Sequence, residues 1–376
     1  MREMAHRGKQ KRVYLFLDEI QRLENWELYL KKFHDLRYPV RLVVSGSASS
    51  PIFKKSRESL LGRVKDYHIL PFSFREYLLY HSRENAEITE ELEDTYVKGK
   101  TAQGMFAGDP KHLDLKKVTI YPVSDNLWSA AQAAFKDYIC SGGFPEVWNL
   151  ETWEQRTDYL YDNQVKKVIY EDLLIAAQFR KPEQLKSFYI SLLERPGQEV
   201  NLSQIATETG VLLAQLEKYL PLLEMTDLIT HIKKFRKSPL RVRRGNIKFY
   251  QIDLALRNAV LRLKDEDLAD PTLLGMYAEN LVYNALRKWP GTVAVDYYRE
   301  RDEEVDFIVQ LGSRKFLPLE VKYRESIEDK DLSALLSFCE KFNIHQGVVV
   351  TKNREPFGKQ GNLFYIPLLH FLLLFD

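Results

Sequence analysis

The stretch Val13-Tyr14-Leu15-Phe16-Leu17-Asp18-Glu19 decides the fold of the N-terminal part, because five apolar residues in a row end in two acids. Such a run predicts a strand buried on both faces, as in parallel sheets that helices cover on each side. The two acids then lie where open α/β sheets bind ligands. In enzymes that transfer phosphoryl groups, one acid here holds Mg²⁺ and a neighbour orients the attacking water. Alternatively, Asp18 only caps the helix expected over 21–33.

A second apolar run, 41–45, follows that helix and is itself followed by Gly46-Ser47-Ala48-Ser49. Strand, helix and strand form a βαβ unit in which both strands end at one crevice. Hydroxyl groups in the second turn can contact a phosphate or the attacking water. The alternative is a loop with helix-capping serines. Further on, Ser73 and Glu76 have the spacing of a capping box and predict a helix start.

The composition limits the class of protein. A chain of 376 residues with a formal net charge of +2 predicts two or three domains and no overall bias toward nucleic acid. Cys140 and Cys339 alone predict neither a disulfide framework nor a cysteine-rich zinc site, which fits the cytoplasm. The N-terminal residues have no apolar signal sequence, and the longest apolar run, 366–375, is too short for a bilayer. We therefore expect a soluble cytoplasmic protein without a membrane partner, whose C-terminal apolar run packs as a helix.

Four motifs within the first 80 residues carry a family resemblance: LFLDEIQRLENWE (15–27), VVSGSASS (43–50), LLGRV (60–64) and LPFSFREYL (70–78). Together they resemble prokaryotic AAA-type (AAA+ superfamily) ATPases that end in a domain of unknown function. The resemblance implies ATP and Mg²⁺ as cofactors, Asp18 as the Walker B magnesium ligand and Glu19 as the catalytic base. It also places Ser47 in the sensor-1 turn and makes Arg63 a charge-stabilising arginine at the nucleotide.

The sequence departs from this family in one important respect. P-loop NTPases hold the phosphates with GxxxxGK[ST], and no such motif occurs in these 376 residues. Gly8-Lys9 is followed by Gln10 and has no preceding strand. The N-terminus is therefore expected to be truncated or the motif lost, so this polypeptide should bind ATP poorly or not at all. The sheet would also lack a strand and expose an edge.

The middle of the chain begins with a polar segment, 81–126, expected to be an irregular insertion. Helices are predicted over 127–139, 153–175 and 182–193, and the resemblance implies a helical lid within 81–185. That lid also carries a turn similar to Gly142-Gly143-Phe144-Pro145, which we interpret as structural rather than phosphate-binding because no strand precedes it.

Residues 202–220 have the spacing of a helix-turn-helix, and strands expected over 228–232 and 247–250 would form a wing. A basic hairpin beside such a unit is the charge pattern expected for DNA phosphate contacts. Pro221 is expected to interrupt the second helix, which has few base-reading side chains. The alternative is a winged helix that packs only against its own chain. The candidate DNA-contacting residues are Lys233, Lys234, Arg236, Lys237, Arg241, Arg243 and Arg244.

The last part contains EVDF (304–307) and PLEVK (318–322), a spacing that resembles the PD-(D/E)xK nuclease core. The resemblance implies that Asp306 and Glu320 hold a divalent metal on adjacent strands and that Lys322 activates or stabilises the hydroxide. Alternation puts Glu320 and Lys322 on the same face of one strand, and carboxylates suit Mg²⁺. Glu279, on the preceding helix, is a further candidate metal ligand. The alternative is a buried Asp–Lys–Glu ion network that holds strands together.

The expected architecture is α/β and multidomain. It comprises a partial P-loop NTPase (AAA+) core over 1–80, an insertion and helical lid over 81–185, a winged helix over 186–270 and a restriction-endonuclease-like α/β domain over 271–376. The expected function is ATP hydrolysis coupled to a module acting on DNA. The alternatives are a metal-dependent nuclease or DNA-binding protein that works without nucleotide, and a degenerate relative acting as a regulatory or toxin–antitoxin-like protein. Whether the chain forms a homo-oligomer is left open.

Overall fold

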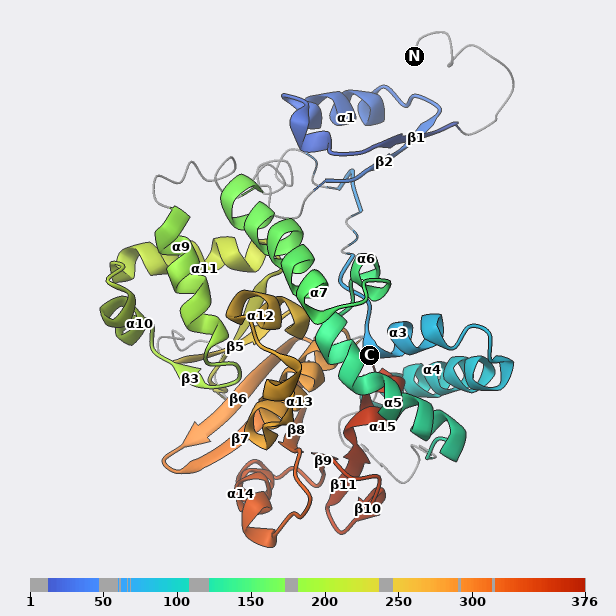
Figure 1. The fold of residues 1–376 in the computed structure, drawn as a ribbon, viewed down its shortest axis with the longest axis vertical. Coiled ribbons are helices and arrows are strands. Elements are labelled where there is room, and N and C mark those ends of the chain that lie inside the picture. Colours follow the sequence, from blue (N-terminus) through green and yellow to red (C-terminus); the bar gives the residue numbers. More distant parts are fainter. Residues whose placement is uncertain are drawn as a thin grey trace.

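The computed structural model describes residues 13–46, 60, 62–65, 67, 69–107, 122–172, 182–236, 246–289, 292–312 and 315–375. These residues form a mixed α/β protein with a two-stranded, a three-stranded and a six-stranded sheet. A small N-terminal α/β unit lies apart from the other elements in Figure 1, and the six-stranded sheet belongs to the C-terminal part.

The N-terminal unit is the predicted βαβ unit. Strands β1 (Val13–Leu17) and β2 (Val40–Val44) are parallel and are connected through a short 3-10 turn (Ile20–Arg22) and helix α1 (Trp26–Asp35). Helix α1 starts later than the sequence pattern predicted. The parallel pairing confirms that both strands end at one side of the unit.

The expectation that β1 is buried on both faces is wrong. Its side chains alternate in exposure, and Tyr14 and Phe16 are 58% and 71% exposed. The opposite face packs through Leu17, with Leu42 and Val44 of β2, onto a small core under α1. Within the described residues α1 covers only this face, so an apolar run suited to a doubly covered strand keeps one side open.

A helical region connects this unit to the rest of the chain. The capping box predicted at Ser73 and Glu76 is confirmed at the start of the first of these helices. The elements of this helical region are α3 (Phe74–His81), α4 (Ala86–Ala107), α5 (Asp125–Ser141), α6 (Pro145–Trp148), α7 (Trp153–Leu160) and π-helical segments at Tyr161–Lys166 and Val168–Asp172.

The prediction of an irregular segment over 81–126 is wrong for helix α4. Small or apolar residues recur on its buried side at Leu92, Thr95, Gly99 and Ala102. Gly99 brings the helix into contact with the backbone of Leu374 in α15 (Leu368–Phe375). The narrow stripe of small residues lies within a mostly charged sequence, which is why the pattern suggested a solvated loop.

The next part consists of α9 (Pro182–Leu193), β3 (Glu199–Val200), α10 (Leu202–Thr209), α11 (Leu213–Met225), β4 (Ile229–Lys233), β5 (Ile247–Gln251) and α12 (Leu254–Leu261). The predicted helix pair and both strands are confirmed, and the antiparallel sheet has the order β3-β5-β4. Pro221 does not interrupt α11. Pro221 has no N–H to donate to the Glu217 carbonyl one turn earlier. Both residues are exposed, so water can bind that carbonyl instead.

The C-terminal part contains 3-10 turns at Asp265–Ala269 and Asp329–Leu332, α13 (Pro271–Leu286), β6 (Ala294–Glu300), β7 (Glu303–Gly312), β8 (Lys315–Lys322), α14 (Ser333–Phe342), β9 (Gly347–Thr351), β10 (Gly358–Gln360), β11 (Leu363–Pro367) and α15. Its sheet has the order β10-β11-β9-β8-β7-β6. Strands β8, β9 and β11 are parallel, and the other pairs are antiparallel. The C-terminal apolar run splits between β11 and the packing helix α15.

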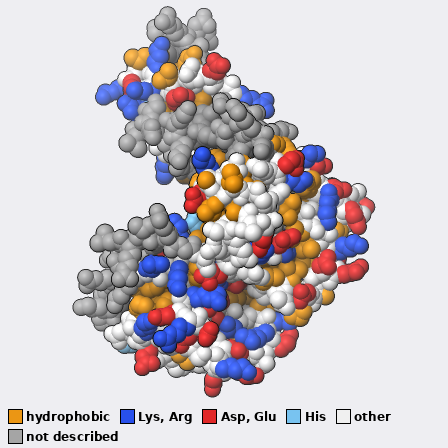
Figure 2. Space-filling model, turned by 90° about the vertical axis from the view of Figure 1, so that its left-hand side faces the viewer, with side chains coloured by type: hydrophobic (Ala, Val, Ile, Leu, Met, Phe, Trp, Pro, Cys, Tyr) orange, Lys and Arg blue, Asp and Glu red, His pale blue; other side chains and the backbone are white. Residues whose placement is uncertain are grey.

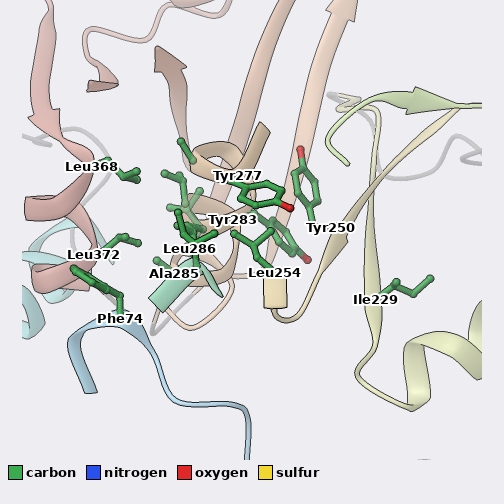
Figure 3. Packing of buried hydrophobic residues seen from close by; sticks show 14 of the residues in the cluster. Phe74, Ile229, Tyr250, Leu254, Tyr277, Tyr283, Ala285, Leu286, Leu368 and Leu372 are labelled. Carbon is green, nitrogen blue, oxygen red and sulfur yellow. The ribbon is translucent and has the colours of Figure 1, made fainter. Parts of the chain in front are cut away.

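A shared core joins the middle and C-terminal parts. Tyr250 of β5 stacks on Tyr283 of α13, with ring centroids 4.5 Å apart. Both rings are labelled in Figure 3. Asn280 of α13 accepts a hydrogen bond from the Gln251 N–H and donates one to the Gln251 carbonyl, both at 2.8 Å. No helix among the described residues is both long and apolar enough to span a bilayer.

Candidate functional sites

The first candidate site lies where β1 and β2 end. The Ser45 hydroxyl donates a hydrogen bond of 2.5 Å to Oδ1 of Asp18, and the Glu19 N–H donates to the same oxygen at 2.9 Å. These two hydrogen bonds lower the pKa of Asp18 and keep it ionised. An exposed carboxylate at the end of two parallel strands has the oxygen chemistry that Mg²⁺ requires.

The other predicted nucleotide-site residues are placed differently. Glu19 follows Asp18 in a left-handed backbone conformation with φ 48° and is half-buried. Arg63 donates to Asp35 at 2.9 Å, at the end of α1 farthest from the strand ends. The structure therefore does not bring Arg63 to Asp18. Ser47 lies outside the described residues.

The second candidate site lies where β7 and β8 separate. Phe307 and Leu319 are the last paired residues at this end of the two strands. Beyond them, the Val321 N–H donates a hydrogen bond to Oδ2 of Asp306 at 2.8 Å. The Asp306 N–H donates to Oε2 of Glu320 at 3.3 Å, and the Lys322 ammonium donates to Oε1 of the same carboxylate. The structure thus brings together the three residues of the predicted Asp…Glu-x-Lys pattern.

Burial and charge act in opposite directions at this site. Glu320 is 4% exposed, and burial together with the charge of Asp306 raises its pKa, while Lys322 opposes the increase. Burial lowers the pKa of Lys322, but Glu320 and Asp306 outweigh it and the net change is upward. A second positive charge near the two carboxylates would favour their ionised forms.

Glu279 stands apart from this trio. On α13, its Oε1 accepts from the Lys248 ammonium at 3.2 Å and from the Tyr250 hydroxyl at 2.7 Å. Burial raises the pKa of Glu279, and Lys248 counteracts it. In the described part of the chain, no three His, Cys, Asp or Glu side chains are arranged to hold a metal ion. The structure therefore does not assemble the predicted set of Glu279, Asp306 and Glu320 around one point.

The basic hairpin between β4 and β5 is anchored on the C-terminal part. Phe235 is buried in a second core cluster with Phe316, Phe338 and Phe342 around it. Its N–H donates to the Tyr297 carbonyl of β6 at 2.6 Å. The candidate DNA-contacting residues Lys233, Lys234 and Arg236 are partly exposed, whereas Lys237, Arg241, Arg243 and Arg244 lie outside the described residues.

The surface charge adds little to the DNA prediction. On the face shown in Figure 2, basic and acidic side chains are interspersed. This face therefore adds no separate basic patch to the hairpin, where phosphate contacts would be local.

Sequence reasoning missed Ser45, Tyr250 and Glu304 as site residues and counted Lys248 only among the basic residues of the hairpin. A signal existed for Ser45, since Leu17 pairs with Val44 and the next residues along the parallel strands are Asp18 and Ser45. No comparable signal identifies Lys248, because its partners come from α13 and β7, far away in the sequence.

Comparison with known proteins adds family matches to this geometry. Residues 1–78 match a family described as an AAA domain. Residues 132–267 and 274–371 match two families described as domains of unknown function, DUF8612 and DUF4143. The resemblance to proteins that combine an AAA domain with a C-terminal domain of unknown function is confirmed at this level.

The curated relatives that this chain matches are described as uncharacterized proteins. Two proteins of Methanocaldococcus jannaschii are 20% and 23% identical to this chain; the matches cover 92% and 97% of it and 70% and 71% of the relatives. An uncharacterized protein of Haemophilus influenzae is 24% identical, over 81% of this chain and 64% of its own length. No solved structure matches the chain significantly.

Proposed function

We propose that this protein works as part of an AAA-type ATPase in which residues 13–46 supply the magnesium-binding and water-activating half of a nucleotide site. The observation that carries the proposal is the Ser45–Asp18 hydrogen bond, which fixes an ionised carboxylate at the ends of two parallel strands. The AAA domain match over the same residues supports it. Asp18 would hold Mg²⁺, which neutralises phosphate charge, and Glu19 would orient the attacking water.

The phosphate-binding half is not in this sequence, because GxxxxGK[ST] does not occur in it. We therefore expect no ATP binding by this chain in calorimetry at micromolar concentrations. Micromolar affinity would show that another segment holds the phosphates and would overturn this division of the site.

Asp18 itself can be tested without nucleotide. Mn²⁺ replaces Mg²⁺ and broadens the NMR signals of nearby amides even when it binds weakly. We expect broadening at Glu19 and Ser45, lost in Asp18→Asn and kept in Glu24→Gln, which removes an exposed carboxylate of the same unit. Equal broadening in the Asp18→Asn variant would refute the assignment.

A second candidate function is metal-dependent cleavage of DNA by the C-terminal part, whose mixed sheet would be of the PD-(D/E)xK nuclease type. The specific observation is the assembly of Asp306, Glu320 and Lys322 at the separation of β7 and β8. The two carboxylates fit a hard divalent cation, which would lower the pKa of a bound water. Lys322 would stabilise the resulting negative charge. On this proposal the winged-helix unit (β3, α10, α11, β4, β5) presents the basic hairpin to DNA.

Incubation with plasmid DNA and Mg²⁺ or Mn²⁺ tests this candidate. Glu320→Ala is expected to reduce cutting by at least about 100-fold, as loss of a metal ligand should. Glu328→Ala is the control, since it removes an exposed carboxylate from the same domain. Absence of cutting by the unaltered chain, or equal cutting by Glu320→Ala, would refute nuclease activity.

A further inference from the structure

Lys248 is the most deeply buried charged side chain near the second candidate site. It comes from β5 of the middle part, is 2% exposed, and approaches Oε1 of Glu304 at 2.6 Å and Oε1 of Glu279 at 3.2 Å. Its ammonium also lies 5.6 Å from the centre of the Tyr297 ring. A lysine from one part of the chain is thus enclosed by acidic and aromatic side chains of another.

The charge balance around Lys248 explains why it stays ionised. Burial lowers the pKa of Lys248, but Glu279, Asp306 and Glu304 outweigh burial and raise it overall. The charge of Asp306 acts on both Lys248 and Glu320. The charge of Asp306 therefore favours the ionised form of both buried ammonium groups, Lys248 and Lys322.

The orientation of Glu279 is fixed by the middle part of the chain. Lys248 and Tyr250 both donate to its Oε1. Its carboxyl group faces Gly197, where an added Cβ would lie 3.0 Å from Oε2 and 3.1 Å from Oε1. Glu279 is therefore held by Lys248 and Tyr250, and among the described residues it does not form a three-residue metal-ligand group with Asp306 and Glu320.

Further contacts keep β5 in this position. Arg299 of β6 bridges Oε2 of Glu304 at 3.0 Å and Oε2 of Glu199 in β3 at 3.1 Å. The Tyr297 hydroxyl donates to Glu199 and to the Asn246 carbonyl, beside the start of β5. These contacts therefore help to hold the three-stranded sheet against Glu279 and Glu304, the two carboxylates that pair with Lys248.

We propose that Lys248 is a positioning residue of the second candidate site: its ammonium is the permanent counter-cation of Glu279 and Glu304 and so restricts divalent-metal binding to one ion at Asp306 and Glu320. This inference rests on the metal-dependent function proposed above and specifies how that site is limited. The cation that a second metal ion would supply is replaced by a lysine from the neighbouring part of the chain. The site is consequently built from two parts of the chain rather than one.

The test is a titration of the full chain with Mn²⁺, followed by calorimetry and by the EPR signal of free Mn²⁺. We expect one ion per unaltered chain, and two ions for Lys248→Met, because Glu279 then lacks a counter-charge and Glu304 keeps only Arg299. Lys248→Arg keeps a cation in place and should restore one ion. A Lys248→Met variant with the same stoichiometry and affinity as the unaltered chain would overturn the inference.

A second variant covers the case in which Lys248→Met does not fold. Glu279→Gln should leave the affinity of the single ion within about twofold, because Glu279 is not a ligand, whereas Glu320→Gln should abolish binding. Loss of the ion in Glu279→Gln would also overturn the inference. If the unaltered chain binds no Mn²⁺, the metal-dependent function itself fails, an outcome distinct from equal binding by the Lys248 variants.

Discussion

The ammonium of Lys248 lies 2.6 Å from Oε1 of Glu304, so a buried ion pair ties β5 of the middle part to β7 of the C-terminal sheet. Pairs of this kind contribute little compared with a well-packed apolar contact, but the removal of one partner is costly. The pair therefore matters most as a constraint on how the two parts of the chain are arranged.

Glu304→Gln should lower the free energy of unfolding by about 2 kcal/mol, since a buried ammonium loses one of its two charged partners. Urea unfolding measures the effect. Lys341→Met is the control, because the Lys341–Glu300 pair is about half exposed and should contribute less than about 1 kcal/mol. Equal changes in the free energy of unfolding for the two variants would mean that the Lys248–Glu304 pair contributes no more than a surface pair.

Gly99→Ala and Gly275→Ala should change stability in opposite directions although both glycines are helical. A Cβ at Gly99 would overlap the carbonyl oxygen of Leu374, so α4 and α15 must separate and several kcal/mol are lost. Nothing lies within 4 Å of a Cβ at Gly275, so alanine should stabilise α13 by up to about 1 kcal/mol. Thermal unfolding distinguishes the two, and destabilisation by Gly275→Ala would contradict the prediction.

Phe235→Ala should cost about 3–4 kcal/mol, because the ring fills a cluster of three other phenylalanines. Leu212→Ala, 70% exposed in the helix turn, should cost almost nothing. Denaturant unfolding gives both values. A loss below about 1 kcal/mol for Phe235→Ala would mean that the hairpin is not anchored on the C-terminal part.

Asp253 should make stability fall as the pH rises from about 4 to about 6. Its carboxylate accepts from the Gly143 N–H at 2.8 Å and caps α12, but burial raises its pKa from 3.8 to about 6. Between these values the folded chain holds a proton that the unfolded chain has released, so a rise in pH favours unfolding. Across this pH window the free energy of unfolding should fall by at most about 3 kcal/mol.

Asp253→Asn removes this titration. The stability of the variant relative to the unaltered chain should increase across that window and stay constant above it. Urea midpoints at several pH values provide the measurement, and a constant difference from pH 4 to 7 would contradict the assignment.

If the hairpin contacts DNA as proposed, replacing Lys233, Lys234 and Arg236 by Gln should weaken binding to all sequences alike. Each lost phosphate contact should reduce the slope of log K against log salt by about 1. Fluorescence anisotropy at several salt concentrations measures the slope. Lys98→Gln, on α4, serves as the control, and an unchanged slope in the triple variant would mean that these residues do not touch DNA.

The elements that sequence patterns predicted well are those with a local cause. Ser73 and Glu76 mark a helix start through their own side chains, and 182–193 matches α9 in full. The proximity of Asp306 and Glu320 was expected from the resemblance of their spacing to a nuclease core, and strand alternation placed Glu320 and Lys322 on one face. In each case the deciding interaction lies within a helix turn or between adjacent strands.

The failures have a nonlocal cause. Whether Phe16 is covered depends on what lies over the second face of β1, which the sequence of β1 does not encode. Helix α4 depends on Gly99 meeting the far C-terminus. Glu279 was assigned to a metal, yet Lys248 and Tyr250 hold it, and neither is close to it in sequence.

The side chain of Asn280 reproduces, toward Gln251, the donor and acceptor pair that a neighbouring strand would present. An α-helix of the C-terminal part thereby completes the backbone hydrogen bonding of a strand in the middle part. A chain cut between α12 and α13 would leave that peptide group unsatisfied and the Tyr250 ring uncovered. We therefore expect the two parts to melt in a single cooperative transition, so that the smallest independently folding unit spans both.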